Sequence, residues 1–308
     1  MPIALCRLGQ ARPASTVTHG WTPACGHPMK PENKESKVKY KKVVVVLVAV
    51  LAMTLGSLGV GNAIMFGELD GEDHPYVGLM VADVDGVPAW RCSGTLIAPT
   101  VFLTAGHCVH EATAARVWFD TDLTDNEEYP FGGDTSIEGT PIPHGSFTGA
   151  LTLPNTSDVG LVILSEPVTD LGFGELPSIG LAEELNGPPG KTATLNIVGY
   201  GLQAVKPVEL AERVRYQATP MLVELHGSLT RDYGIHLSSN PGKGGGTGGT
   251  CFGDSGGPNF LNDSNVVAGV TSYGMNSNCA GTGGVYRVDR ADDLDWLYTD
   301  FGSHLPAP

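Results

Sequence analysis

One serine of the chain is surrounded by residues that bend the backbone. Ser255 lies in residues 251–258, CFGDSGGP, with an acid before it and two glycines and a proline after it. A serine hydroxyl is a weak nucleophile at neutral pH, and it becomes reactive when an imidazole accepts its proton and a carboxylate orients that imidazole. This stretch is therefore either a flexible surface turn or a backbone bent to present a nucleophile.

A histidine and a carboxylate of the right kind precede this serine. His107 follows an apolar run in residues 103–108, LTAGHC, where small residues leave room around the ring. Asp158 lies in residues 155–164, NTSDVGLVIL, directly before a strand-like apolar run, so a partly buried carboxylate there needs a partner such as an imidazole N–H. Taken singly, each residue also fits a structural role in a loop or turn.

Together, the motifs TAGHC, SDVGLVIL and GDSGGP, in this order, resemble the chymotrypsin-like (trypsin-fold) serine endopeptidases, as a secreted, bacterial-type member. The resemblance extends from about Ile64 to the C-terminus. Gly106 stands where the family usually has alanine, and the surroundings of Asp158 depart from the family's usual sequence. The resemblance implies a triad in which Ser255 attacks, His107 moves the proton and Asp158 holds the imidazole.

The resemblance also assigns a role to the backbone beside the serine. The N–H groups of Gly253 and Ser255 would form an oxyanion hole, and glycine is needed at position 253 so that its N–H can turn inward. Asp254 would pair with the ammonium of a free N-terminus at Ile64, where residues 64–67, IMFG, look like a divergent form of the family's N-terminal motif.

By the same resemblance, the base of the primary substrate pocket is Gly249. The remaining pocket positions include Thr250, Ser272, Tyr273, Gly274 and Gly284. No carboxylate occupies these positions, so we expect an open, neutral pocket for apolar or aromatic side chains and no strong preference for Arg or Lys.

Two other functions compete with this assignment. GDSGG also fits the G-x-S-x-G turn of α/β-hydrolases, but that fold needs a helix directly after the serine and a later histidine. Gly256, Gly257 and Pro258 cannot start a stable helix, and the sole later histidine is His304. The second alternative is a non-catalytic binding module on the same fold, a class that ordinarily lacks a residue of the triad or oxyanion hole.

Four cysteines follow residue 63: Cys92, Cys108, Cys251 and Cys279. An even number in an exported chain indicates two disulfides, and the spacing allows three pairings. If Cys92 pairs with Cys108 and Cys251 with Cys279, the disulfides would flank His107 and Ser255. Zinc is the alternative, but the four show no CxxC spacing, and adjacent His107 and Cys108 are too close in sequence to share one tetrahedral ion without strain.

A cluster of acidic residues follows His107 at the place where some family members carry a calcium loop. A solvated acidic turn is the commoner structure for such a cluster, and calcium ligation is the alternative. The residues concerned are Asp120, Asp122, Asp125, Glu127 and Glu128. The resemblance otherwise implies no cofactor and no metal.

The first 63 residues differ in composition from the rest. Six lysines between Lys30 and Lys42 precede an apolar run of 13 residues, 43–55, and small residues at Gly61 and Ala63. This pattern predicts a signal peptide over 29–63, cleaved after Ala63, with an uncleaved membrane anchor as the alternative. Residues 1–28 are expected to be an upstream extension or a disordered leader, and residues 64–308 the protease domain.

The charge of the expected mature protein excludes one class of partner. Residues 64–308 hold ten Lys or Arg and 31 Asp or Glu. Because such an acidic protein repels phosphates, nucleic acid binding is not expected. We expect instead a secreted monomer that acts on polypeptides and has no stable membrane association after signal cleavage.

The apolar residues occur mostly in short runs separated by turn residues, which favours an all-β fold. The family resemblance implies two packed six-stranded antiparallel barrels with the site between them. One helix is expected over residues 289–301, DRADDLDWLYTDF, with Asp289 as its cap and apolar residues at helical spacing.

Overall fold

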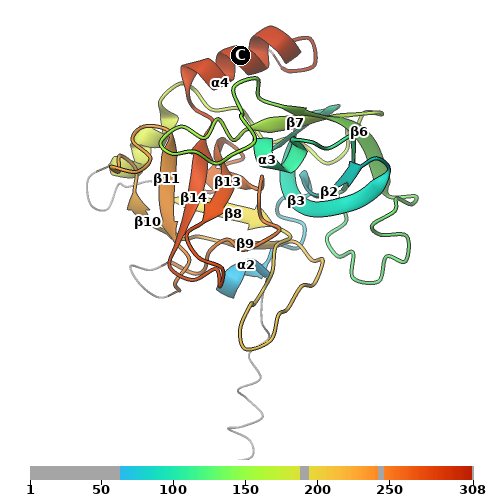
Figure 1. Ribbon diagram of the computed structural model, residues 1–308, viewed down its shortest axis with the longest axis horizontal. Coiled ribbons are helices and arrows are strands. Elements are labelled where there is room, and N and C mark those ends of the chain that lie inside the picture. Colours follow the sequence, from blue (N-terminus) through green and yellow to red (C-terminus); the bar gives the residue numbers. More distant parts are fainter. Residues whose placement is uncertain (1–62, 188–193, 242–245, 307–308) are drawn as a thin grey trace, which may run out of the picture. The chain divides into compact units, whose positions relative to one another are not determined.

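The computed structural model describes residues 63–187, 194–241 and 246–306. The predicted leader and nearly all of the predicted signal peptide lie outside these residues. Six antiparallel strands of the first half close into a barrel (Figure 1). In barrel order they are β2 (Val77–Val84), β3 (Val87–Ala98), β4 (Val101–Thr104), β7 (Gly160–Leu164), β6 (Ser136–Pro143) and β5 (Ala114–Trp118).

Seven strands of the second half and the N-terminal strand β1 form one sheet of eight strands, where the sequence predicted a second six-stranded barrel. The two-residue strand β1 pairs with β9 at one edge, and β10 lies at the other edge. In sheet order the strands are β1 (Glu68–Leu69), β9 (Tyr216–Ala218), β8 (Leu195–Gly199), β12 (Pro258–Leu261), β13 (Val267–Gly274), β14 (Thr282–Arg287), β11 (Gly234–Ser238) and β10 (Met221–Glu224).

In the described part of the chain, the helices are short except at the C-terminus. They are α2 (Ala63–Phe66), α3 (Gly106–Val109), the 3-10 helix η1 (Leu181–Asn186) and α4 (Ala291–Phe301). The predicted C-terminal helix is present, but Asp289 does not cap it. Arg290 is at the N-cap position of α4, and the Asp289 carboxylate instead binds the Arg287 guanidinium at 2.8 Å.

A fully buried arginine joins the second sheet to the barrel. Arg215, next to β9, pairs through Nε with Asp70 Oδ2 at 2.8 Å. Its remaining donors reach backbone carbonyl groups, which include those of Val77 at 3.2 Å and Phe119 at 3.1 Å. Because Val77 begins β2, this one side chain fixes the edge of the second sheet against the first barrel.

Candidate active site

The barrel holds His107 and Asp158 next to each other. His107 lies on α3 directly after β4, and Asp158 lies two residues before β7. Because Thr104 of β4 is paired with Gly160 of β7, the two side chains start from neighbouring points. His107 Nδ1 is 2.9 Å from Asp158 Oδ2, and the His107 backbone N–H donates to Asp158 Oδ1 at 2.8 Å.

Ser272 is a further partner of this carboxylate that the sequence did not reveal. Its hydroxyl comes from β13 of the second sheet and donates to Asp158 Oδ2. The sequence placed Ser272 only in the substrate pocket. Asp158 is fully buried, and these donors fix its orientation, so that it holds the His107 ring with Nδ1 toward the carboxylate.

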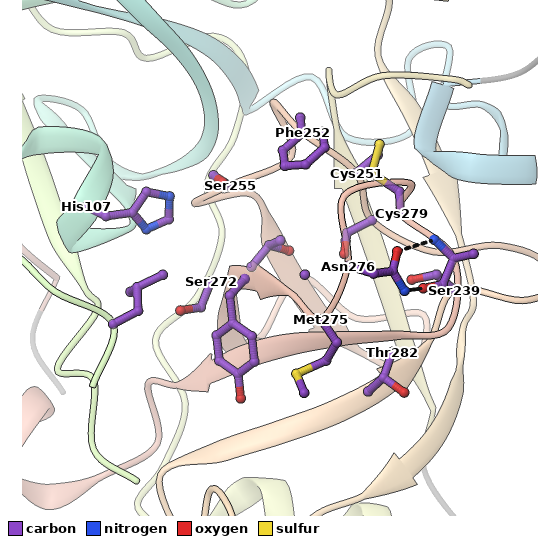
Figure 2. A pocket seen from close by; sticks show the side chains of 17 residues that line it. His107, Ser239, Cys251, Phe252, Ser255, Ser272, Met275, Asn276, Cys279 and Thr282 are labelled. Carbon is purple, nitrogen blue, oxygen red and sulfur yellow. Dashed lines mark hydrogen bonds between the residues drawn. A yellow bond between two sulfur atoms is a disulfide. The ribbon is translucent and has the colours of Figure 1, made fainter. Parts of the chain in front are cut away.

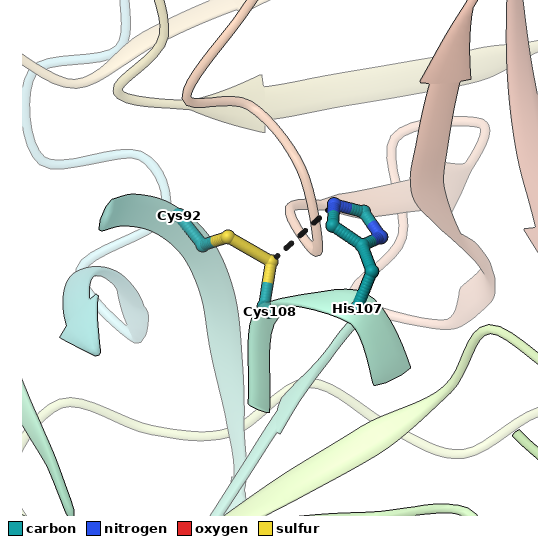
Figure 3. A group of neighbouring side chains, drawn as sticks. All are labelled: Cys92, His107 and Cys108. Carbon is teal, nitrogen blue, oxygen red and sulfur yellow. Dashed lines mark hydrogen bonds between the residues drawn. A yellow bond between two sulfur atoms is a disulfide. The ribbon is translucent and has the colours of Figure 1, made fainter. Parts of the chain in front are cut away.

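Ser255 of the second sheet lines the same pocket as His107. It lies in the turn before β12, and its carbonyl accepts a hydrogen bond from Ser93 N of the barrel at 2.8 Å. Figure 2 shows His107 and Ser255 at one end of a single pocket. Among the described residues no hydrogen bond joins the Ser255 hydroxyl to His107; Nε2 instead lies 3.7 Å from Cys108 Sγ (Figure 3).

The backbone before Ser255 has the conformation expected of an oxyanion hole. Gly253 has φ of +99°, which favours glycine over residues with a side chain. In the described part of the chain, neither Gly253 N nor Ser255 N donates to a protein acceptor. Ser93 fixes this turn, because its hydroxyl donates to Gly253 O at 2.8 Å and accepts from Tyr200 N at 2.9 Å.

Two disulfides flank the site, Cys92–Cys108 beside His107 and Cys251–Cys279 beside Ser255. Of the three pairings that the spacing allowed, this is the one in which a separate disulfide lies beside each of the two residues. Cys92, His107 and Cys108 also lie close enough together to suggest a metal site. The disulfide removes both thiolates that an ion would need, so these residues do not fit a metal centre.

The pocket next to Ser255 is a cavity of about 270 Å³. Four of the predicted positions line it: Thr250, Ser272, Tyr273 and Gly274. Its other lining residues include Ser239, Cys251, Met275, Cys279, Thr282 and Gly283. No Asp, Glu, Lys or Arg side chain is among the described lining residues.

Two of the predicted pocket positions lie outside this lining. Gly249 packs on the backbone of Ser239, since a Cβ at position 249 would be 2.3 Å from Ser239 Cα. Gly284 lies beneath the Tyr273 ring, where a Cβ would be 2.2 Å from the ring. The neighbouring Gly283 of β14 lines the cavity, and the β13–β14 pairing beside it has a register shift between Thr271 and Tyr273.

Asp254 is buried and has no cationic partner among the described residues. Its carboxylate accepts hydrogen bonds from Gly201 N at 2.7 Å and Cys251 N at 2.8 Å. Burial raises the pKa of Asp254 to about 7, although these hydrogen bonds and the charge of Arg91 act to lower it. In the uncut chain the nitrogen of Ile64 is a peptide nitrogen, and the Ile64 side chain is fully buried.

The five acidic residues considered for calcium do not converge. Within the described residues, no three of these carboxylates lie close enough to hold one ion. The guanidinium of Arg213 binds two backbone carbonyls of this loop. It donates through Nε to Leu123 O at 3.0 Å and through Nη2 to Thr124 O. The described carboxylates therefore give no support for calcium ligation.

The sequence and the fold are both similar to those of known proteins. The family model described as Trypsin matches residues 71–296. Brachyurin from Leptuca pugilator is 29% identical over 237 residues, which cover 68% of this chain and 88% of brachyurin. Chymotrypsin from Phaedon cochleariae is 28% identical over 236 residues, which cover 73% of this chain and 77% of that protein.

A solved structure of HL collagenase shows the same fold. It aligns with a TM-score of 0.59 at 23% identity and covers 78% of this chain and 99% of its own. The two named relatives come from animals, so they do not support the bacterial-type assignment. Among the described residues, no helix has the length and apolar character needed to cross a membrane.

Proposed function

Because this chain belongs to the trypsin family of serine endopeptidases, we propose that Ser255, His107 and Asp158 are its catalytic triad. The observation that carries this proposal is the His107–Asp158 contact of 2.9 Å at the edge of the cavity that Ser255 also lines. The two halves of the chain supply different members of the triad, which is why their packing matters for activity.

In the proposed reaction, Ser255 Oγ attacks the carbonyl carbon of the scissile peptide bond while His107 Nε2 accepts its proton. The resulting oxyanion accepts hydrogen bonds from the N–H groups of Gly253 and Ser255. His107 then gives the proton to the leaving amine, and water hydrolyses the acyl-enzyme by the same steps. Catalytic hydrogen bonds are often long in the absence of substrate, so the Ser255–His107 bond is expected to form with substrate bound.

The proposed substrates are polypeptides with a large uncharged residue before the scissile bond (P1). The described cavity lining lacks Asp, Glu, Lys and Arg, and the Tyr273 ring and the Cys251–Cys279 disulfide supply apolar walls. These features support apolar or aromatic P1 side chains. Members of this family need no cofactor, and the residues considered for calcium give no reason to add one.

We further propose that export and activation are one step. Signal cleavage after Ala63 would free the ammonium of Ile64 and release an active, monomeric enzyme outside the cell. Met65 O already accepts a hydrogen bond from Gly249 N at 3.1 Å, so the segment next to the cut lies against the second sheet. The buried Asp254 carboxylate, which has no described cationic partner, supports pairing with that ammonium.

The experiment is hydrolysis of chromogenic peptides by the chain that begins at Ile64, beside Ser255→Ala. We expect cleavage after Phe, Tyr or Leu, and a loss of about a million-fold in kcat in the variant, as for removal of a triad serine elsewhere. A serine-directed phosphonate should label the parent and not the variant. Ser303→Ala, an exposed serine near the C-terminus, is the matched control and should keep full activity.

Cleavage after Arg would keep the mechanism and contradict the neutral pocket. Absence of both hydrolysis and label would contradict the triad and favour the non-catalytic binding module.

A further inference from the structure

The far end of the substrate cavity presents hydroxyl groups. Ser239, Thr250 and Thr282 all line the cavity. Figure 2 shows Ser239 and Thr282 on the side of the pocket away from His107 and Ser255. A side chain that enters beside Ser255 and extends to the end of the cavity therefore meets this group with its tip.

Two of these hydroxyls converge on one point. A Cβ placed on Gly283 would lie 2.9 Å from Thr250 Oγ1 and 3.7 Å from Ser239 Oγ. Gly283 has no side chain, so the space between the two oxygens stays open. The bare glycine and the two hydroxyls together form a polar floor, by which we mean Ser239, Thr250 and Gly283.

The hydroxyls of the floor are not used by the protein. Ser239 is only 4% exposed, and its backbone N–H donates to Gly281 O at 2.8 Å. Its hydroxyl, like that of Thr250, makes no hydrogen bond to any described residue. Ser272 in the same cavity differs, because its hydroxyl is held by Asp158. A buried hydroxyl that reaches a cavity and has no protein partner is available to a ligand.

Two walls of the cavity are apolar. The Tyr273 hydroxyl is turned away to His236 Nε2 at 2.9 Å, so Tyr273 presents its ring. The Cys251–Cys279 disulfide forms another wall. Because no charged side chain lies among the described residues of the floor or walls, the complementary ligand group is neutral.

We infer that this cavity selects P1 side chains that end in a neutral hydrogen-bonding group, either the phenol of tyrosine or the carboxamide of glutamine. A hydroxyl both donates and accepts, so the floor can satisfy either group. Phenylalanine and methionine have similar shapes but leave the floor hydroxyls without a partner once water is displaced. The inference rests on the proposed function and narrows its substrate class.

The test uses four peptides that differ only at P1, as Tyr against Phe and Gln against Met, with the chain that begins at Ile64. One or two neutral hydrogen bonds correspond to about 5- to 20-fold in kcat/KM. We expect kcat/KM to be higher by a factor in that range for Tyr over Phe, for Gln over Met, or for both. The Tyr/Phe pair tests recognition of the phenol, and the Gln/Met pair tests recognition of the carboxamide.

The variants Ser239→Ala and Thr250→Val remove one hydroxyl each with little change in volume. Each should lower the Tyr/Phe or Gln/Met ratio toward one, because cleavage after Tyr or Gln falls more than cleavage after Phe or Met. Thr230→Val removes a buried hydroxyl that lies outside the cavity and should leave the ratios unchanged.

Each outcome decides the inference. Parent ratios near one, or equal losses on all four peptides in the variants, would overturn it while the proposed function stands. Failure to cleave any of the peptides would overturn the proposed function and the inference with it.

Discussion

Two buried carboxylates of this chain differ in what surrounds them. Asp70 contacts the Arg215 guanidinium at 2.8 Å and His74 Nδ1 at 2.5 Å. Burial alone would raise the pKa of Asp70, but its hydrogen bonds and charge interactions with His74 and Arg215 lower it. Asp254 is equally buried, has backbone N–H donors and no described cationic partner, and its pKa is raised to about 7.

Asp70 has a cationic partner in this structure, whereas Asp254 has none among the described residues. The Asp70–Arg215 pair holds the second sheet against the barrel and needs nothing further. A buried carboxylate without a cation is costly, and this cost supports the proposal of a later partner. We propose the Ile64 ammonium as that partner, and the pairing can be measured.

The largest expected loss of stability comes from breaking the Asp70–Arg215 pair. Arg215→Met leaves Asp70 buried without its main partner and also removes donors to Val77 and Phe119. We expect the free energy of unfolding to fall by about 3–5 kcal/mol in urea titrations at pH 7. Adding Asp70→Asn should recover part of this loss. A loss below about 1 kcal/mol would show that Arg215 does not join the two halves.

The next effect concerns Asp254 and depends on pH. In the uncut chain the folded state keeps the Asp254 proton up to about pH 7, whereas the unfolded state releases it near the ordinary value of 3.8. Ionisation therefore favours unfolding, and this carboxyl lowers stability as the pH rises from about 4 to about 7. Uncut Asp254→Asn should be more stable than its parent at pH 8, by about 2–4 kcal/mol.

Cleavage after Ala63 should reverse that result. Pairing with the Ile64 ammonium lowers the pKa of Asp254, so in the processed chain Asp254→Asn should become destabilising and inactive. Thermal unfolding of the four proteins between pH 4 and 8 measures both effects. Asp293, whose pKa is also raised to about 7 by burial, is common to all four and cancels in the differences. An equal pH slope in the uncut and processed chains would contradict the pairing.

The smallest expected effect is at His74. Its ring stacks on Phe260 with centroids 5.1 Å apart, and its Nδ1 is the second partner of Asp70. His74→Phe keeps a stacking ring and removes the hydrogen bond, so we expect a loss of about 1–2 kcal/mol, well below that for Arg215. Chemical denaturation at pH 7 provides the value. A loss equal to that of Arg215→Met would mean that the two partners of Asp70 act as one unit.

The sequence predicted the parts of the site that local motifs encode. Ser255 and His107 lie in short, distinctive stretches, and the conformation of Gly253 follows from the turn around the serine. The Asp70–Arg215 pair could not be predicted, because its members are 145 residues apart and each is an ordinary charged residue in its own segment. Ser272 as a partner of Asp158 was missed for the same reason.

Errors in the prediction arose where strand register or competing partners decide the structure. Gly283 of β14 lines the cavity next to the register shift in β13, which no local sequence pattern marks. Asp289 has the right residue type for a helix cap, but Arg287 is two residues away in the sequence and binds its carboxylate. The strand β1 has only two residues, so the sequence could not reveal its pairing with β9.

An open sheet has consequences for how molecules of this protein meet each other. The first barrel has no free strand edge, but the second sheet ends at β10, whose backbone groups could pair with a strand of another molecule. Two features oppose this: a register irregularity between Leu222 and Glu224, and the partly exposed carboxylate of Glu224 itself. A bulge and a charge on an edge strand discourage aggregation. The exposed edge of the second sheet is therefore protected by its own residues, whereas the first barrel is protected by its closure.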